Sequence, residues 1–512
     1  MIEHLNVNAT IVFVAFFALV TVMGFYAARW KAGDLTELAE WGLGGRRFGA
    51  WITWFLLGGD LYTAYTVIAV PGVVYAAGAY GFFAVPYTIL IYPFLFLTFP
   101  RLWNVSHKRG YITASDFVFG RYGNKWLELA VALTGILATM PYIALQLVGM
   151  EVVIKALGFQ GEGLLAHLPL TIAFVILALY TYSSGLRAPA MIAFVKDIMI
   201  YIFVIAAVVI IPAKLGGYQQ IFTDAARILA AKKGNIILGP AQIVPFMTLA
   251  FGSAMALFIY PHSLTGILSA SSGKTIKRNA MMLPAYSLVL GLIAILGLMA
   301  LAAGIETKNS TEVVPLLFLK MFPDWFVGFC FAAIAIGALV PAAVMSIGAA
   351  NTFTRNVWRP FINPNLSGAA EAQLAKIMSL VVKLGALVVI VYAPTKFAID
   401  LQLLGGVWML QIFPALVFGL YTRWFNPVAL LIGWALGMGI GSSLAFQGDL
   451  IKNLYPLFTG GPSVYIGILA VVVNIASAAI LTLVLPRTTF DETKAGDYVP
   501  GGDPVRVLDI VH

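Results

Sequence analysis

The chain has 512 residues, of which 61% are hydrophobic and 10% charged, against roughly 25% charged residues in a typical soluble domain. Apolar runs of about 20 residues, long enough to cross a bilayer, recur along nearly the whole sequence. The sequence therefore predicts an all-α polytopic membrane protein. A formal charge of +9 would suggest nucleic acid in a soluble chain, but here the basic residues lie in the loops, and no nucleic-acid partner is expected.

Thirteen apolar runs are predicted to form transmembrane helices. They lie near residues 8–29, 49–76, 79–100, 126–155, 167–186, 189–213, 243–267, 279–304, 326–355, 374–393, 397–421, 426–445 and 464–486. Basic residues concentrate in alternate connections, for example Arg47, Arg109, Arg355 and Arg423. Because basic loops stay in the cytoplasm, we expect the N-terminus outside and the C-terminus inside, with a mobile cytoplasmic tail after the last run.

A single carboxylate, Asp60, lies inside the second apolar run and follows Gly58-Gly59. A charge at bilayer depth costs about 2.5–3.5 kcal/mol even on lenient insertion scales, so such residues usually serve a function. The paired glycines weaken the helix and would free backbone carbonyls to bind an ion. We interpret this segment as an ion or substrate site.

The seventh run has a matching interruption at Tyr260-Pro261-His262. The two interrupted runs are five spans apart, so each would open one five-helix unit of an inverted repeat. Interrupted helices at corresponding places in two halves indicate a binding site near the bilayer midplane. The alternative is that these glycines and prolines are ordinary residues of membrane helices.

These features resemble the solute:sodium symporter family over roughly residues 8–487. The segments that carry the resemblance are 44–72, 110–123, 261–262, 341–346 and 354–356. Within the family, three segments are most similar to bacterial monocarboxylate permeases, namely 60–66, 139–146 and 260–266.

The resemblance implies a LeuT-type fold of two inverted five-helix repeats that works by alternating access. It divides the chain into a peripheral helix (8–29), the two repeats (49–213 and 243–421), two peripheral helices (426–486) and the tail (487–512). The implied function is cation-coupled symport of lactate, pyruvate, acetate or propionate, with alanine as a further candidate, across the bacterial inner membrane. We expect no enzyme activity, no cofactor beyond Na⁺ or H⁺ as coupling ion, and no obligate protein partner.

The family binds a sodium ion between its first and eighth core helices. By resemblance, the ligands here would be the carbonyls of Gly58, Leu61 and Ala343 and the hydroxyl of Ser346. The next position, commonly Ser or Thr in the family, is Ile347, so the site loses one expected ligand.

The sixth apolar run contains Lys196-Asp197. By resemblance, Asp197 matches a family aspartate, whereas Lys196 replaces a residue that is usually uncharged. Burial disfavours the charged form of lysine, and proton-coupled relatives on this fold place a lysine near the vacant sodium site. We hypothesise that Lys196 takes over part of the role of sodium, with protons as the coupling ion. The alternative is that Lys196 snorkels to the interface near Arg187. For the embedded Lys383 we expect a structural role.

Candidate substrate-binding residues lie at the two interruptions and on neighbouring spans. The N-termini of half-helices attract carboxylates, and the scarcity of amides and carboxylates in the core suits a small anion with a short apolar tail better than a sugar. The candidates are Tyr62, Thr63, Tyr65, Thr66, Tyr142, Gln146, Phe258, Tyr260, His262, Trp408 and Gln411. Ordinary helix packing is the alternative for the aromatic ones, and a hydrogen-bonded structural role is favoured for His262.

Two other functions compete with this interpretation. The nearest is a Na⁺-coupled symporter of another small solute, such as proline or pantothenate. A passive channel would show a continuous polar stripe on several helices, whereas the polar residues here gather at two helix breaks. Since no His, Cys or carboxylate group has metal-ligand spacing, we predict no transition metal.

Overall fold

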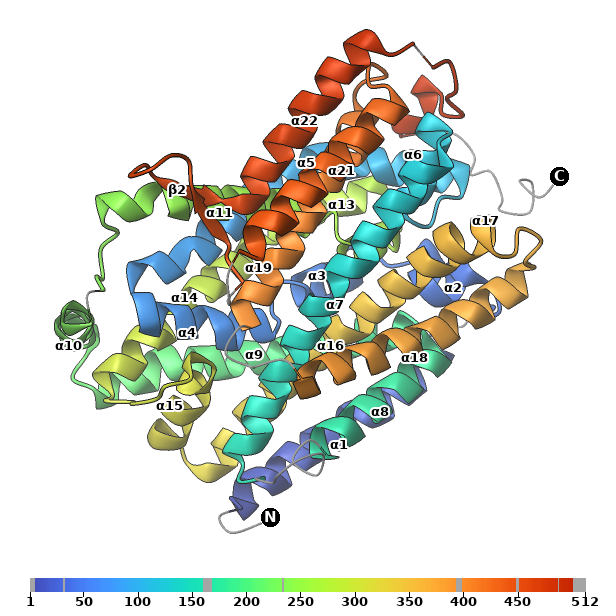
Figure 1. Cartoon of the computed structure of the whole chain (residues 1–512). Helices are drawn as coiled ribbons and strands as arrows, with labels where there is room; N and C mark the ends of the chain where they lie inside the picture. Colours follow the sequence, from blue (N-terminus) through green and yellow to red (C-terminus); the bar gives the residue numbers. More distant parts are fainter. Residues whose placement is uncertain are drawn as a thin grey trace.

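A computed structural model of the chain describes residues 5–30, 33–159, 168–232, 234–392, 398–447, 451–486 and 488–500. They form a bundle of long apolar helices that run side by side (Figure 1). Ten helices in this part of the chain are long and apolar enough to cross a membrane, and three further apolar helices are shorter. The all-α membrane fold is confirmed, while the count of thirteen spans stays a prediction.

The described residues up to 232 form the helices of the first part of the bundle. The α-helices are α1 (Val7–Tyr26), α2 (Leu38–Leu43), α3 (Ala50–Gly59), α4 (Val70–Ala77), α5 (Ala84–Arg109), α6 (Ala114–Tyr122), α7 (Lys125–Ala156), α8 (Leu168–Ser184), α9 (Arg187–Lys214) and α10 (Tyr218–Ala231). The short 3₁₀ and π segments are η1 (Ala27–Arg29), η2 (Gly44–Arg46), the π-helix η3 (Tyr65–Ala69) and η4 (Ala79–Phe83).

The described residues from 234 onward form the second part, with one antiparallel hairpin between α21 and α22. The α-helices are α11 (Pro240–Leu257), α12 (Pro261–Leu268), α13 (Gly273–Met282), α14 (Pro284–Ala302), α15 (Val313–Met321), α16 (Asp324–Phe353), α17 (Arg359–Phe361), α18 (Gly368–Tyr392), α19 (Ala398–Met409), α20 (Phe413–Leu416), α21 (Pro427–Ala445) and α22 (Ile466–Val484). The hairpin is β1 (Leu454–Pro456) and β2 (Ser463–Tyr465), with Leu454 opposite Tyr465. The short segments are η6 (Ser310–Glu312), the π-helix η7 (Thr354–Trp358), η9 (Leu410–Ile412), η10 (Phe418–Leu420) and η11 (Ala495–Tyr498).

Two membrane helices are broken where the sequence predicted interruptions. The first stops at Gly59, and the chain becomes helical again in η3 and α4. The second stops at Leu257, and α12 begins at Pro261. Proline suits a first helical turn because its φ is fixed and an N–H there has no intrahelical partner.

A continuous helix, α16, runs past the break between α11 and α12. It is buried along most of its length and packs against α1, α7, α9, α12 and α18. The close approach needs a glycine at position 348, since a Cβ there would lie 2.8 Å from the backbone nitrogen of His262. The fold thus brings α16 to the second interruption.

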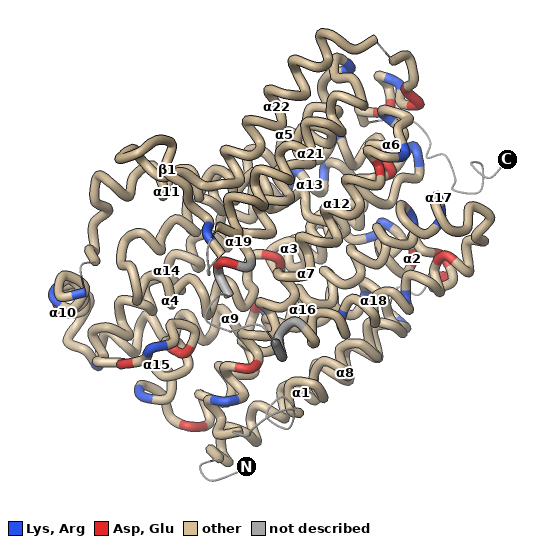
Figure 2. The backbone as a smooth tube through the Cα atoms, viewed as in Figure 1, with Lys and Arg blue, Asp and Glu red and all other residues tan. Residues whose placement is uncertain are grey.

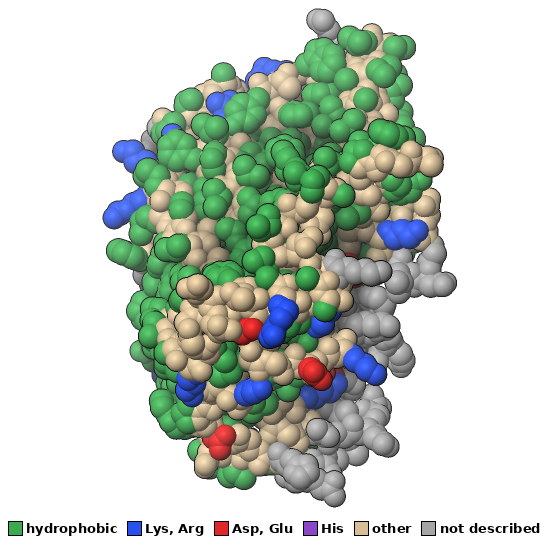
Figure 3. Space-filling view, turned by 90° about the vertical axis from the view of Figure 1, so that its left-hand side faces the viewer, with side chains coloured by type: hydrophobic (Ala, Val, Ile, Leu, Met, Phe, Trp, Pro, Cys, Tyr) green, Lys and Arg blue, Asp and Glu red, His purple; other side chains and the backbone are tan. Residues whose placement is uncertain are grey.

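Charged residues collect toward the two ends of the bundle (Figure 2). We call the end with α6, α17 and residues 488–500 the tail end, and the end with α10, α15 and the hairpin the opposite end (Figure 1). Hydrophobic side chains cover much of the face in Figure 3. Apolar side chains within long helices, such as Val209, Leu288 and Leu384, are exposed as lipid-facing residues would be.

The first part of the C-terminal tail is docked onto the bundle. Arg121 pairs with Asp491 at 2.5 Å, and Arg109 pairs with Asp497 at 2.6 Å. The buried ring of Tyr498 lies under the guanidinium group of Arg121, 5.8 Å from the ring centroid. The prediction of a mobile tail is therefore wrong for residues 488–500, because buried contacts with α5 and α6 hold them.

Candidate functional site

The carboxylate of Asp60 lies at the break between α3 and η3 and is buried, with 4% of the residue exposed. It lies beside the hydroxyl of Ser263, in the first turn of α12, and is attracted by the ammonium of Lys196. The N-terminus of a helix carries partial positive charge, which favours a carboxylate there. Asp60 therefore lies where the breaks of the two interrupted helices come together.

Side-chain hydrogen bonds satisfy the backbone at this break. The amide nitrogen of Ala64 donates to Oε1 of Gln146 at 3.0 Å, and that of Tyr65 donates to Oγ1 of Thr63 at 3.1 Å. The hydroxyl of Thr66 donates to the carbonyl of Leu61. Thr63, Thr66 and Gln146, predicted as substrate ligands, therefore use these groups to hold the interrupted backbone.

The ammonium of Lys196 reaches the same break from α9. Its Nζ lies 3.3 Å from the carbonyls of Gly59 and Tyr62 and 2.9 Å from Oδ1 of Asp197. Both charged side chains are completely buried, so Lys196 does not snorkel toward the interface near Arg187. A cationic group thus lies against the carbonyls of Gly59 and Tyr62. Each of these residues directly follows a residue, Gly58 or Leu61, whose carbonyl the resemblance implied as a sodium ligand.

The oxygens implied as sodium ligands have partners within the protein. The hydroxyl of Ser346 donates to the carbonyl of Ala343 at 2.8 Å. The carbonyl of Gly58 accepts from the amides of Leu61 and Tyr62, at 2.9 and 3.0 Å, and that of Leu61 accepts from Thr66. Position 347 has no side-chain oxygen, so these four atoms are the sodium ligands that the resemblance leaves here.

Two tyrosines that the sequence analysis did not single out complete the group around Lys196. The hydroxyl of Tyr286 donates to Oδ2 of Asp197 at 2.5 Å, and the hydroxyl of Tyr62 donates to the carbonyl of Tyr286 at 3.2 Å. The ring of Tyr201 lies 5.8 Å from that of Tyr62. We call Tyr62, Lys196, Asp197, Tyr201 and Tyr286 the charge cluster. The i,i+4 spacing from Asp197 could have identified Tyr201, whereas no sequence signal identifies Tyr286.

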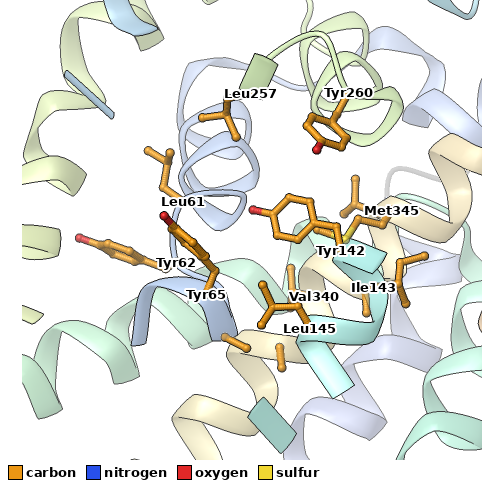
Figure 4. Close-up of a cluster of buried hydrophobic side chains, with 14 of the residues drawn as sticks. Leu61, Tyr62, Tyr65, Tyr142, Ile143, Leu145, Leu257, Tyr260, Val340 and Met345 are labelled. Carbon is orange, nitrogen blue, oxygen red and sulfur yellow. The ribbon is translucent and has the colours of Figure 1, made fainter. Parts of the chain in front are cut away.

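Four aromatic residues from three elements surround a second region next to Asp60. The ring centroids of Tyr142 and Tyr260 are 5.8 Å apart, and that of His262 lies 5.4 and 5.3 Å from them. Tyr65 approaches from η3, whereas Tyr62 is directed away from Tyr142 and Tyr260 (Figure 4). We call Tyr65, Tyr142, Tyr260 and His262 the aromatic cluster.

Several buried polar atoms at the aromatic cluster have no hydrogen-bond partner among the described residues. They are the hydroxyls of Tyr65 and Tyr260 and both ring nitrogens of His262. The hydrogen-bonded role expected for His262 is therefore not seen, and its ring is held by packing. A buried polar group without a partner costs about 1–3 kcal/mol, so a small polar solute would gain hydrogen bonds here.

The structure does not bring Trp408 and Gln411 to either cluster. Nε1 of Trp408 donates to the hydroxyl of Ser442 on α21 at 3.0 Å. Oε1 of Gln411 accepts from Nδ2 of Asn474 on α22 at 3.3 Å. Both predicted ligands therefore face α21 and α22.

Phe258 and Lys383 also lie in packing environments. The ring of Phe258 meets that of Phe99 edge-on at 6.2 Å. Lys383 is buried in α18, and its Nζ donates to the carbonyl of Ser379 at 3.4 Å. It has no ion pair within the part of the chain that the structure describes. The structural role expected for Lys383 stays a prediction.

Two other segments of the resemblance meet at the tail end. Nδ2 of Asn356 donates to Asp116 at 2.7 Å and to Glu128 at 2.9 Å, and its Oδ1 accepts from Thr113 at 2.6 Å. Arg355 lies 3.4 Å from Asp116. These bonds connect the starts of α6 and α7 to η7, which directly follows α16.

Comparison with known proteins assigns the family. A protein-family model described as "Sodium:solute symporter family" matches residues 41–437 of the chain. The chain belongs to this family. It is 60% identical over 490 residues to the "Monocarboxylate transport permease protein" of Rhizobium johnstonii, covering 95% of this chain and 99% of that one. It is 22% identical to "Sodium/proline symporter 2" of Staphylococcus saprophyticus, covering 85% of each chain.

A solved structure confirms the fold. A Na⁺-coupled sialic acid symporter in a substrate-bound outward-open state matches with a TM-score of 0.77 and 14% identity, covering 94% of this chain and 99% of that one. The LeuT-type architecture implied by the resemblance is thereby confirmed. The protein is a multi-span membrane transporter of a small solute and not an enzyme.

Proposed function

We propose that this symporter carries short monocarboxylates such as lactate, pyruvate, acetate or propionate into the bacterial cytoplasm together with protons. It would lie in the inner membrane with its N-terminus outside and its tail end in the cytoplasm, as the positive-inside rule favours. The observation that carries the substrate class is the set of buried, unpartnered hydroxyls at the aromatic cluster. The 60% identical relative, named a monocarboxylate permease, supports the same class.

A short monocarboxylate suits the chemistry of this region. The hydroxyls of Tyr65 and Tyr260 would donate to the solute carboxylate, while Leu257 and Met345, which lie beside the aromatic cluster in Figure 4, would cover a short apolar tail. Hydrogen bonds to a charged group contribute about 1.5–3 kcal/mol each, so two donors would give useful affinity.

The charges near the aromatic cluster explain why such a solute would need a coupling cation. When Asp60 and Asp197 are both ionised and Lys196 is protonated, these three side chains carry a net charge of −2 + 1 = −1. In a low-dielectric site this net charge would repel an anion. One added proton cancels it, so the solute and the proton would bind together.

The contacts of Lys196 favour a proton over sodium as that cation. Its ammonium already lies against the carbonyls of Gly59 and Tyr62, and Ile347 offers no side-chain oxygen as a further sodium ligand. Sodium coupling of another solute, such as proline, is the second candidate, because the family includes sodium/proline symporters.

Uptake of labelled lactate into proteoliposomes tests the substrate class. We expect pyruvate, acetate and propionate to compete with lactate, and proline and pantothenate not to compete. Tyr65→Phe and Tyr260→Phe should each raise the KM for lactate about tenfold, because each removes one donor to a carboxylate.

Tyr122→Phe is the matched control, because Tyr122 is also buried with an unpartnered hydroxyl among the described residues but lies at the tail end on α6. Its KM should equal that of the wild type. Absence of lactate uptake, or competition by proline alone, would contradict the proposed substrate class.

A further inference from the structure

A cavity of about 310 Å³ lies at the opposite end of the bundle. Both broken helices line it, through Val73 of α4 and Leu249 of α11, together with α19 and the segment before β1. Its polar and charged lining residues are Tyr80, Asp400, Lys452 and Asn453.

This cavity lies close to the aromatic cluster along α19. Asp400 and Leu403 line the cavity, and Gly405 packs on Tyr260, whose hydroxyl lies 2.6 Å from where a Cβ at Gly405 would be. Five helical residues rise about 7.5 Å, so Asp400 lies about that far along the helix axis from the aromatic cluster. A solute arriving from the opposite end would meet this cavity before it reached Tyr260.

The described lining of the cavity contains one acidic side chain, one basic side chain and one amide oxygen without a hydrogen-bond donor. Oδ1 of Asp400 accepts from Nδ2 of Asn453 at 2.6 Å. Asn453 is 9% exposed, and its Oδ1 has no partner among the described residues. The ammonium of Lys452 is exposed and makes no ion pair within the described part of the chain. Tyr80 is the one other titratable group in the described lining.

We propose that this cavity is an outer capture site for the solute carboxylate, in which Lys452 attracts the anion and Asp400, when ionised, repels it. The inference rests on the proposed monocarboxylate function and deepens it. Charges that line a cleft raise the local concentration of oppositely charged solutes and lower that of like-charged ones. The charge of Asp400 thus sets how strongly this cavity attracts an anionic solute.

The repulsion depends on pH within the range in which bacteria grow. Burial raises the pKa of Asp400 to about 6, with the hydrogen bond from Asn453 opposing the shift. Asp400 is therefore mostly neutral at pH 5.5 and ionised at pH 7.5. Short carboxylic acids ionise near pH 4, as side-chain carboxyls do, so the solute stays an anion at both values. Its capture should be stronger at pH 5.5.

Equilibrium exchange of labelled lactate in proteoliposomes, with the same pH on both sides, measures how strongly the solute is captured in the absence of a proton gradient. Because the coupling proton also favours solute binding at low pH, the variants are compared at one pH at a time. At pH 7.5 the KM of Asp400→Asn should be about threefold below that of the wild type, and at pH 5.5 the two should agree. Lys452→Gln should raise the KM about threefold at both pH values. High salt should reduce all three differences, because it screens exposed charges.

Glu306→Gln and Lys308→Gln are matched controls, since both residues are exposed in the loop after α14 and lie outside the described lining of the cavity. They should leave the KM unchanged. Thermal melting checks that Asp400→Asn is folded, and Lys452→Gln alone carries the test if it is not.

Three results would overturn the capture site. The first is a KM of Lys452→Gln equal to that of the wild type, and the second is a KM of Asp400→Asn equal to that of the wild type at pH 7.5. If the wild type exchanges lactate normally in either case, the proposed function stands while the capture site fails. The third is a wild-type protein that exchanges no lactate, which contradicts both proposals.

Discussion

Asp60 and Lys196 are the two buried charges that approach the first helix break from different elements. Asp60 belongs to the interrupted segment itself, and Lys196 reaches its carbonyls from α9. A carboxylate and an ammonium so placed can respond to a proton and to an anionic solute at once, because neither is screened by water. Coupling between the two cargoes would therefore reside in these side chains.

Asp60→Asn tests the carboxylate. The amide keeps the size of the side chain and can still interact with Ser263, so the protein should fold, but lactate should no longer accumulate above equilibrium. The accumulation ratio in proteoliposomes is the measurement, and Asp34→Asn, an exposed residue before α2, is the control. Full accumulation by Asp60→Asn would refute the role of this carboxylate.

Lys196→Met tests the buried ion pair. Removing one partner leaves Asp197 buried and unpaired, and such changes cost about 3–5 kcal/mol of stability. The double variant Lys196→Met/Asp197→Asn should recover most of the melting temperature while proton-driven uptake stays absent. If Lys196→Met alone melts like the wild type, the ammonium does not balance Asp197.

Residue-level predictions from the sequence succeeded unevenly. Asp60 was identified because a charge in an apolar run is conspicuous. Trp408 and Gln411 lie on one side of a helix. Because a membrane helix is apolar on all sides, its hydrophobic pattern does not show which neighbouring helix that side contacts. Tyr286 was missed because it reaches Asp197 across 89 positions of sequence.

At the scale of elements, local rules predicted both helix breaks. The glycines before Asp60 and the proline at 261 act on their own backbone, so their effect can be read from a few residues. The docking of the tail could not be predicted in this way. Its partners on α5 and α6 lie hundreds of residues earlier, and a polar composition does not reveal them.

Removal of the ion pair between the tail and α6 should destabilise the protein. Asp491→Asn takes the carboxylate from Arg121, whose side chain is 4% exposed, and we expect a loss of about 3 kcal/mol. Thermal melting in detergent measures it. Lys494→Gln is the control, since that side chain is exposed and forms no ion pair in the described residues. Equal melting of both variants would show that the docked tail contributes no stability.

At the scale of the whole molecule, two broken helices and one continuous helix bring the Asp60 site together inside an apolar bundle. The fold class could be predicted because apolar runs and interruptions are strong signals in a membrane protein. The coupling ion could not, since family membership favours sodium while the contacts of Lys196 favour a proton. Only a measurement that separates the two gradients distinguishes them.

Uptake of labelled lactate into proteoliposomes under separately imposed gradients tests proton coupling most directly. With sodium absent and the outside more acidic than the inside, lactate should accumulate above its equilibrium level, and a sodium gradient at equal pH should drive no accumulation. Accumulation that requires sodium and ignores the pH gradient would contradict proton coupling through Lys196.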